Sequence, residues 1–188
     1  MKRNSFGKLV LKGIGFIVLG NVMCLVMTMA IFMFGSHAIT KVLAILFAAL
    51  IFFSLVFTVA WKDGDRERKL VSLHPEIGER KLRWLGIGGI MFAFAAAPTI
   101  FILINKLFFP ESDNLIIYQF VSGSSYPFVI AFTPRPESLS GDVSRIETMS
   151  ALLPSLLLAY YALIPVVTQI GFRCGYNDTL NSDKVIYK

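Results

Sequence analysis

The side chains best suited to chemistry are carboxylates and guanidinium groups. Asp63, Asp65 and Arg66 stand almost together, and Arg173 follows much later in the chain. An enzyme acting on polar headgroups would use such groups as acid, base and anion-binding residues at one interface. Loss of activity without loss of folding on replacing Asp65 and Arg173 singly would support that hypothesis. The set is sparse, and we predict no catalytic residues.

The cysteines and histidines predict neither a metal site nor a disulfide. Cys24 falls within an apolar run and Cys174 just after another, while His37 and His74 are expected on opposite sides of the membrane defined below. No CxxC pair or His pair is therefore available to hold zinc. The chain also lacks a GxSxG elbow, an HExxH pair and a P-loop. We expect no cofactor.

Four apolar runs dominate the sequence: residues 13–34, 42–60, 85–104 and 151–170. All 18 Lys and Arg and all 12 Asp and Glu lie outside these runs. About 20 apolar residues, rising ~1.5 Å each in a helix, cross the ~30 Å hydrocarbon core of a bilayer. Charged residues are 16% of the chain, against ~25% in soluble domains. The sequence predicts an all-α, single-domain, membrane-embedded four-helix bundle surrounded by a lipid bilayer.

The basic residues predict which side of the bundle faces the cytoplasm. The net charge is +6, and all but four of the 18 Lys and Arg precede the first span, follow the fourth, or lie between the second and third. Short loops rich in Lys and Arg stay in the cytoplasm. We predict a plasma-membrane protein with both termini cytoplasmic, a cytoplasmic hairpin at 61–84 and an irregular outer segment at 105–150. No nucleic-acid partner is expected.

A cleavable signal is the alternative for the first span. Ser36, His37 and Ala38 form a small-x-small tripeptide after a basic start and an apolar stretch. A signal h-region has ~7–15 residues, whereas residues 13–34 are long enough to act as an anchor. We expect the span to be retained. Cleavage would leave three spans and an outer N-terminus.

The polar residues inside the predicted spans are all neutral. Coupled transporters usually carry ionisable side chains at membrane depth and are built from inverted repeats, for which four spans are few. Both points weigh against a self-contained coupled transporter. Asn21 and Gln169 are the candidate intramembrane polar contacts, and hydrogen bonds between helices would contribute ~0.6–2 kcal/mol each. The alternative is that they line a path between several copies, together with a kinked fourth span.

Small residues and prolines indicate how the spans pack. Gly89, Ala93 and Ala97 recur at a spacing of four, which lets a neighbouring helix, by preference from the same chain, approach the third span closely. Pro165 within the fourth span and Pro98 within the third remove backbone donors. We expect both helices to be kinked.

The cytoplasmic hairpin is the leading surface for a protein partner. Strong helix formers after residue 60 predict that the second span continues as a helix until Pro75 turns the chain. Trp61 and Trp84 are expected at the membrane interface. The candidate partner-docking residues are Trp61, Asp65, Arg66, Arg173 and Tyr176.

The outer segment, 105–150, is too long for a plain connection. Its apolar stretches, Leu115–Phe120 and Tyr126–Phe132, are too short to span and are separated by Ser122-Gly123-Ser124-Ser125. Three structures stay open: a strand hairpin, an interfacial helix on the outer leaflet, and a re-entrant segment. The first two would place Tyr118, Phe120, Tyr126 and Phe128 among the headgroups. An exposed loop is expected around Pro134 and Pro136, and Ser144 is a potential cap for the last helix.

A family resemblance rests on short motifs in the last two thirds of the chain. The motifs are Ala60-Trp61, Gly64-Asp65-Arg66, Leu70-Val71, the run 86–89, Gly171-Phe172-Arg173-Cys174-Gly175-Tyr176 and Lys184-Val185-Ile186-Tyr187-Lys188. Together they resemble a family of small membrane proteins from Gram-positive, largely clostridial, bacteria, although Asn177-Asp178 replaces an expected basic residue. No activity is attached to that family, so the resemblance implies a bacterial plasma membrane and the topology, without a mechanism.

Two functional classes follow from these features. The first is a non-catalytic accessory or interaction subunit, such as an assembly factor or an immunity-type protein, that works by contact with a partner. The second is an oligomeric channel or transporter component, which needs several identical copies. A membrane-embedded enzyme is the third hypothesis. Native mass in detergent would separate the first two, because a strict monomer would exclude a pore between copies.

Overall fold

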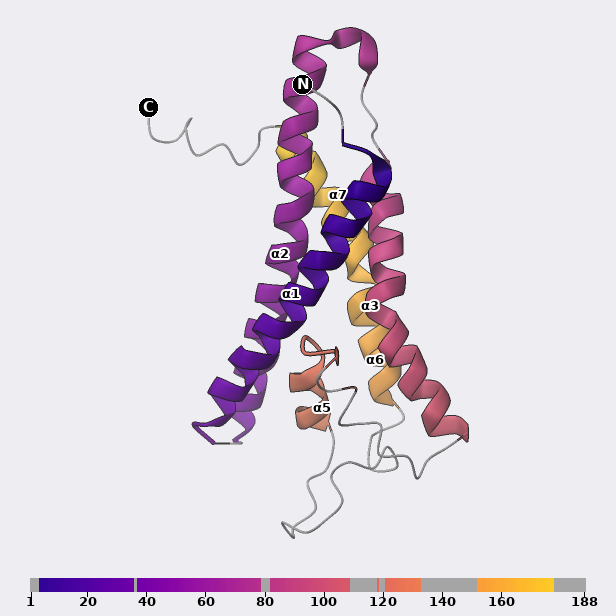
Figure 1. Ribbon diagram of the computed structural model, residues 1–188. Helices are drawn as coiled ribbons and strands as arrows, with labels where there is room; N and C mark the ends of the chain where they lie inside the picture. The colour runs from indigo at the N-terminus through magenta and orange to yellow at the C-terminus, as the bar shows by residue number, and fades with distance from the viewer. Residues whose placement is uncertain are drawn as a thin grey trace.

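The computed structural model describes residues 4–35, 37–78, 82–108, 118, 121–132 and 152–177, which form helices joined by turns, with no strand among them. The helices are α1 (Phe6–Phe32), α2 (Ala38–Leu73), the 3-10 helix η1 (Pro75–Ile77), α3 (Arg83–Phe108), α5 (Tyr126–Phe132), α6 (Leu152–Tyr161) and α7 (Leu163–Tyr176). The long helices run lengthwise in one bundle (Figure 1). The all-α prediction is confirmed for these ranges.

Four elements are long and apolar enough to cross a membrane. They are α1, α2, the Arg83–Asn105 part of α3, and the α6–α7 pair. Only 22 to 39% of their most apolar windows is buried inside the protein, so most of this apolar surface faces outward. Lipid solvates such a surface well and water does not. The structure confirms four candidate spans and is compatible with a multi-pass membrane protein.

The core lies where α7 packs against both α2 and α3, while α1 crosses in front of α2 (Figure 1). Trp84, Tyr161 and Phe52 are among the largest fully buried side chains. The rings of Phe52 and Tyr161 meet edge to face, with 6.0 Å between their centroids, a geometry that adds to the stabilisation from burial. These contacts tie α2 and α3 to the α6–α7 pair.

Glycines on α2 and α7 allow the two helices to meet backbone to backbone. A Cβ on Gly175 would overlap the carbonyl oxygen of Trp61, and a Cβ on Gly64 would overlap that of Phe172. One turn away, a Cβ on Gly171 would lie 2.8 Å from the Phe57 carbonyl oxygen. This is the close approach that small residues at a spacing of four permit between membrane helices.

The small-residue stripe of Gly89, Ala93 and Ala97 was predicted to pack against a neighbouring span, and it does not. Ala93 and Ala97 are exposed, and a Cβ added to Gly89 would meet nothing within 4 Å. The prediction of a same-chain partner for this stripe is therefore wrong. Gly88, one residue earlier, makes the close contact instead, against the Cα of Pro165 and the hydroxyl of Thr168.

Proline breaks the fourth span as predicted, and the break falls at Ala162. α6 ends at Tyr161 and α7 begins at Leu163. Pro165 has no backbone N–H to donate to the carbonyl group four residues earlier, and its ring clashes with that group. Pro98 is accommodated inside α3, which continues to Phe108 and changes direction along its length (Figure 1).

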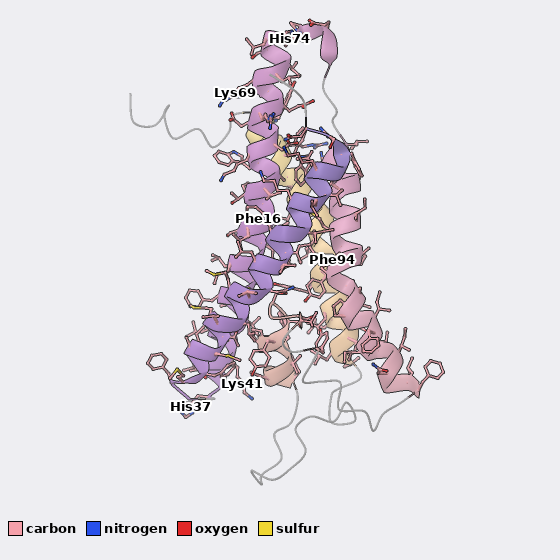
Figure 2. The ribbon with its side chains drawn as sticks, in the orientation of Figure 1. Phe16, His37, Lys41, Lys69, His74 and Phe94 are labelled. Atoms are coloured by element: carbon pink, nitrogen blue, oxygen red, sulfur yellow. The ribbon has the colours of Figure 1, made fainter. Side chains whose placement is uncertain are left out.

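α2 is one continuous helix of 36 residues, which confirms that the second span continues past its apolar run. Its charged part is held in helical form by Asp65, which pairs with Arg68 and Lys69 at 2.8 Å each, the spacings at which charges meet on a helix. The helix ends at Leu73, and Pro75 begins η1 as expected. Figure 2 shows His74 and His37 at opposite ends of the bundle.

Residues 122–129 of the outer segment are buried or partly buried in the bundle. Tyr126–Phe132 is the helix α5, so a strand hairpin is the wrong structure for it. Ser122, Ser124 and Ser125 are almost fully buried, and a Cβ on Gly123 would overlap the carbonyl oxygen of Asn21 in α1. A turn pressed against the middle of a span agrees with the re-entrant alternative, because irregular backbone is tolerated at membrane depth only when protein surrounds it.

The headgroup placement of the aromatic residues is wrong for Tyr118 and Phe128, which are 3 and 9% exposed and belong to the core. The predictions for Phe120, for the loop around Pro134 and Pro136, and for a cap at Ser144 lie outside the described residues.

Candidate functional site

The buried carboxylate of Asp63 forms the first polar centre, at the end of the bundle where the charged part of α2 begins. It is 7% exposed. Its Oδ2 accepts a 3.0 Å hydrogen bond from Trp84 Nε1 of α3, and its Oδ1 accepts one of 3.0 Å from Asn4 Nδ2. A carboxylate can be buried at acceptable cost only when donors replace its lost water.

Two arginines complete this cluster through Asn4. Arg66 Nη1 donates to Asn4 Oδ1 across 2.9 Å, and Arg83 donates to the backbone carbonyl of Asn4. The start of the chain is thereby tied to α2 and α3 at once. We call Asn4, Asp63, Arg66, Arg83 and Trp84 the anchor cluster. Its geometry holds three helices together.

Trp84, predicted as an interfacial anchor, is buried inside the protein instead of being exposed at its surface. Its indole is fully buried between α2 and α3, and its backbone carbonyl accepts a 3.3 Å hydrogen bond from Thr168 of α7. The preference of tryptophan for membrane interfaces reflects one polar N–H on an apolar ring. Here the same N–H is satisfied by a carboxylate inside the protein.

The predicted docking residues belong to three different surroundings. Trp61 and Asp65 meet Gly175 through their backbones at the α2–α7 crossing. Tyr176 stacks on Phe172 of its own helix, and its backbone nitrogen would lie 2.9 Å from a Cβ on Gly64 of α2. These three residues therefore lie at the internal contact of α2 with α7. Arg66 belongs to the anchor cluster, and Arg173 is exposed in the last turn of α7.

Asp65 is a surface ion-pair residue. Its hydrogen bond with Lys69, aided by Arg68, lowers the pKa of its carboxyl group below the ordinary value. About a third of the side chain remains exposed, so solvent screens the pair. Among the described residues, no three His, Cys, Asp or Glu side chains gather as a metal site would require.

Beyond the anchor cluster, the end of α2 projects past the other helices (Figure 1). Figure 2 shows Lys69 and His74 along this projection. Leu73 is 65% exposed, and Glu76 of η1 is exposed as well. We call residues 69–76 the α2 tip. It combines one exposed apolar side chain with charges of both signs.

A second polar centre surrounds the serine turn in the other half of the bundle. Asn21 Oδ1 accepts from the backbone N–H of Ser124 at 3.1 Å and from its hydroxyl at 2.7 Å. The Ser124 hydroxyl also lies 3.1 Å from that of Tyr161. The expected polar contact of Asn21 therefore goes to the serine turn rather than to another span.

Tyr118 extends this network to α3. Its hydroxyl lies 3.0 Å from Thr99 Oγ1 and accepts a 3.0 Å hydrogen bond from Ser125. All three residues are at most 3% exposed. In the sequence these serines only separate two apolar aromatic stretches, and that position was the one signal of a buried turn.

Asn21 and Gln169 are not brought together. Gln169 follows Thr168, whose hydroxyl bonds to Trp84 at the anchor cluster, whereas Asn21 lies at the serine turn. A single path lined by both would have to run between these two levels.

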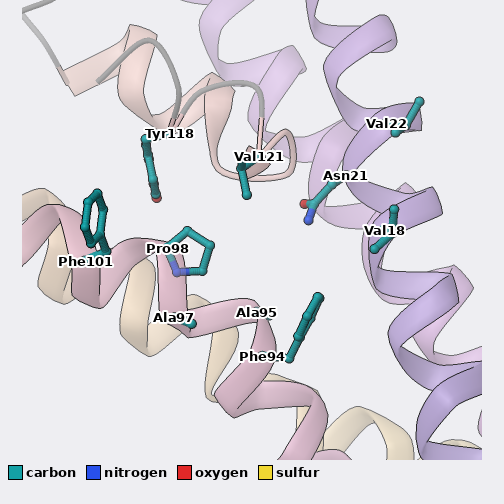
Figure 3. Close-up of a pocket in the computed structure, with 10 residues that line it drawn as sticks. All are labelled: Val18, Asn21, Val22, Phe94, Ala95, Ala97, Pro98, Phe101, Tyr118 and Val121. Atoms are coloured by element: carbon teal, nitrogen blue, oxygen red, sulfur yellow. The ribbon is translucent and has the colours of Figure 1, made fainter. Parts of the chain in front are cut away.

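The space between α1 and α3 holds a cavity of about 580 Å³ (Figure 3). Its lining is apolar except for Asn21 and Tyr118, which stand with Val121 at one end. The lining residues are Val18, Asn21, Val22, Phe94, Ala95, Ala97, Pro98, Phe101, Tyr118 and Val121.

In comparisons with known proteins, no family model, no curated protein and no solved structure matches the chain. The resemblance to a clostridial family therefore stays a prediction, and function has to be argued from the geometry.

Proposed function

We propose that the protein is a non-catalytic accessory subunit of the plasma membrane that acts by contact through the α2 tip. The proposal puts this end in the cytoplasm, and the excess of basic residues at the termini and between the second and third spans supports that orientation. The partner is a cytoplasmic protein or the cytoplasmic domain of a membrane protein.

The observation that carries the proposal is the rigid mounting of an exposed helix end. At ~1.5 Å per residue, the 36 residues of α2 extend about 54 Å, well beyond a ~30 Å hydrocarbon core. The anchor cluster and the glycine contacts with α7 hold the base of the projection. The buried carboxylate thus serves helix packing, and the exposed residues lie beyond it.

Photo-crosslinking in cells tests this function. A photoreactive amino acid at Leu73 should give one discrete adduct larger than the protein, because the α2 tip would lie against its partner. The matched control is the same amino acid at Ile39, which is also exposed but lies at the other end of α2. No discrete adduct from Leu73, or the same adduct from both positions, would refute the proposal.

Native mass in detergent tests the channel hypothesis separately. An accessory subunit is expected to be monomeric when purified without its partner. A ring of several identical copies would favour the oligomeric pore instead.

A further inference from the structure

The cavity between α1 and α3 presents one hydrogen-bond donor to an apolar space. Backbone Ser124 N–H can only donate, so the Asn21 atom that accepts from it must be the oxygen. The amide nitrogen of Asn21 therefore points to the other side, and Figure 3 shows it facing the space between the helices. Among the described residues, no acceptor lies within hydrogen-bonding distance of this nitrogen.

The depth of Asn21 restricts what could accept this hydrogen bond. Asn21 follows Lys12, the last charge before the span, by nine residues, a rise of about 14 Å. Half of the hydrocarbon core is about 15 Å, so the amide stands near the middle of the bilayer. Water is scarce there, and the ester groups of phospholipids lie at the core's edge. A phospholipid tail would leave the donor unsatisfied, at a cost of about 1–3 kcal/mol.

The size of the cavity is that of a small-molecule site rather than of a whole transmembrane helix. A helix with its side chains is about 10–12 Å wide and needs a groove along the membrane. Tyr118 and Val121 close one end of this cavity (Figure 3). Its volume of about 580 Å³ falls in the range of small-molecule sites, ~300–1,000 Å³.

We propose that this cavity binds a lipid-soluble ring ketone of the quinone type, whose carbonyl oxygen accepts a hydrogen bond from Asn21 Nδ2. The ring lies against Phe94 and Pro98, which Figure 3 shows across the cavity from Asn21, and its tail leaves the cavity into lipid. The proposal concerns binding alone. It shares the membrane placement with the proposed function but does not involve the α2 tip.

Binding of two probes to the purified full chain tests the proposal. Decylubiquinone carries ring carbonyls, and decylbenzene has the same tail on a ring without oxygen. Native mass spectrometry from detergent gives the bound fraction of each. Decylubiquinone should bind about threefold to tenfold more tightly, the difference that one neutral hydrogen bond makes. Equal affinities, or co-purified phospholipid that decylubiquinone does not displace, would overturn it.

Two variants and a control locate the site. Asn21→Leu should reduce the affinity for decylubiquinone to that for decylbenzene. Ala97→Phe fills the cavity from an exposed position on α3 without touching the serine turn, and it should abolish binding of both probes even if the Asn21 variant fails to fold. Ile100→Phe, also on α3 but outside the lining, should leave both affinities unchanged. Undiminished binding to Ala97→Phe would refute the site, whereas the Leu73 crosslink would be unaffected.

Discussion

Trp84 donates its indole N–H to the buried carboxylate of Asp63 across 3.0 Å, which joins α3 to the base of the projecting part of α2. The two residues lie 21 positions apart, with η1 between them. The bond therefore closes the hairpin that connects the second and third spans and fixes the direction in which α2 leaves the bundle.

Replacing Trp84 with Phe should destabilise the protein by about 1–3 kcal/mol, because the Asp63 carboxylate loses a donor while remaining buried. The measurement is thermal unfolding in detergent. Trp61→Phe is the matched control, since Trp61 is only partly buried and should tolerate the change. Equal unfolding temperatures for wild type and Trp84→Phe would show that the bond contributes nothing.

The α2–α7 crossing should be intolerant of a single methyl group. Gly175→Ala and Gly64→Ala place a Cβ against carbonyl oxygens of the facing helix, and overpacking should cost at least about 2 kcal/mol. Gly89→Ala is the control because its Cβ would meet nothing, and alanine favours a helix by about 1 kcal/mol. Thermal unfolding should therefore show lower unfolding temperatures for Gly175→Ala and Gly64→Ala and a higher one for Gly89→Ala. A stabilising Gly175→Ala would contradict the close crossing.

Cysteine labelling should reveal both the sidedness and the re-entrant turn. In a background without Cys24 and Cys174, a membrane-impermeant maleimide applied to intact cells should label His37→Cys. It should reach His74→Cys only after permeabilisation, because the histidines lie at opposite ends of the bundle. Ser124→Cys, whose parent side chain is fully buried, should react only after denaturation. Labelling of His74→Cys on intact cells would reverse the proposed orientation.

Acid should weaken the protein in part through Asp65. Its pKa is lowered in the folded state, so its contribution is complete above the unfolded value of about 3.9 and disappears as the pH falls through the lower folded value. Asp65→Asn should therefore reduce the free energy of unfolding at neutral pH by about 0.5 kcal/mol, which is typical of an exposed ion pair. The unfolding temperature should fall slightly as a result. The difference from wild type should shrink below about pH 4. A difference that grows on acidification would contradict the pairing.

The spans and their ends were accessible from sequence because each depends on local chemistry. Apolar length indicated four helices, charged helix formers extended α2 to Leu73, and Pro165 predicted the interruption at Ala162. Each of these effects acts within a few turns, so one sequence contains the information needed.

The two polar centres could not be predicted from the sequence in the same way. Asn4 and Asp63 are 59 residues apart, and Asn21 and Ser124 are 103 apart. Such pairs depend on how the helices are placed in space, and a lone Asn or Ser indicates only that some partner is needed. The stripe at Gly89 failed for a related reason: small residues permit close packing, but they do not specify which of two adjacent glycines faces the neighbour.

The unbroken course of α2 has a mechanical consequence. Because α2 is one rod fixed to α3 and α7, a tilt of the whole bundle by about 5° about its middle would displace the two ends of α2, at Ala38 and Leu73, by roughly 2 Å in opposite directions. Bilayer thickness biases the tilt of long apolar helices. Stretching or thinning of the surrounding lipid would thus be transmitted as a sideways movement at the opposite face.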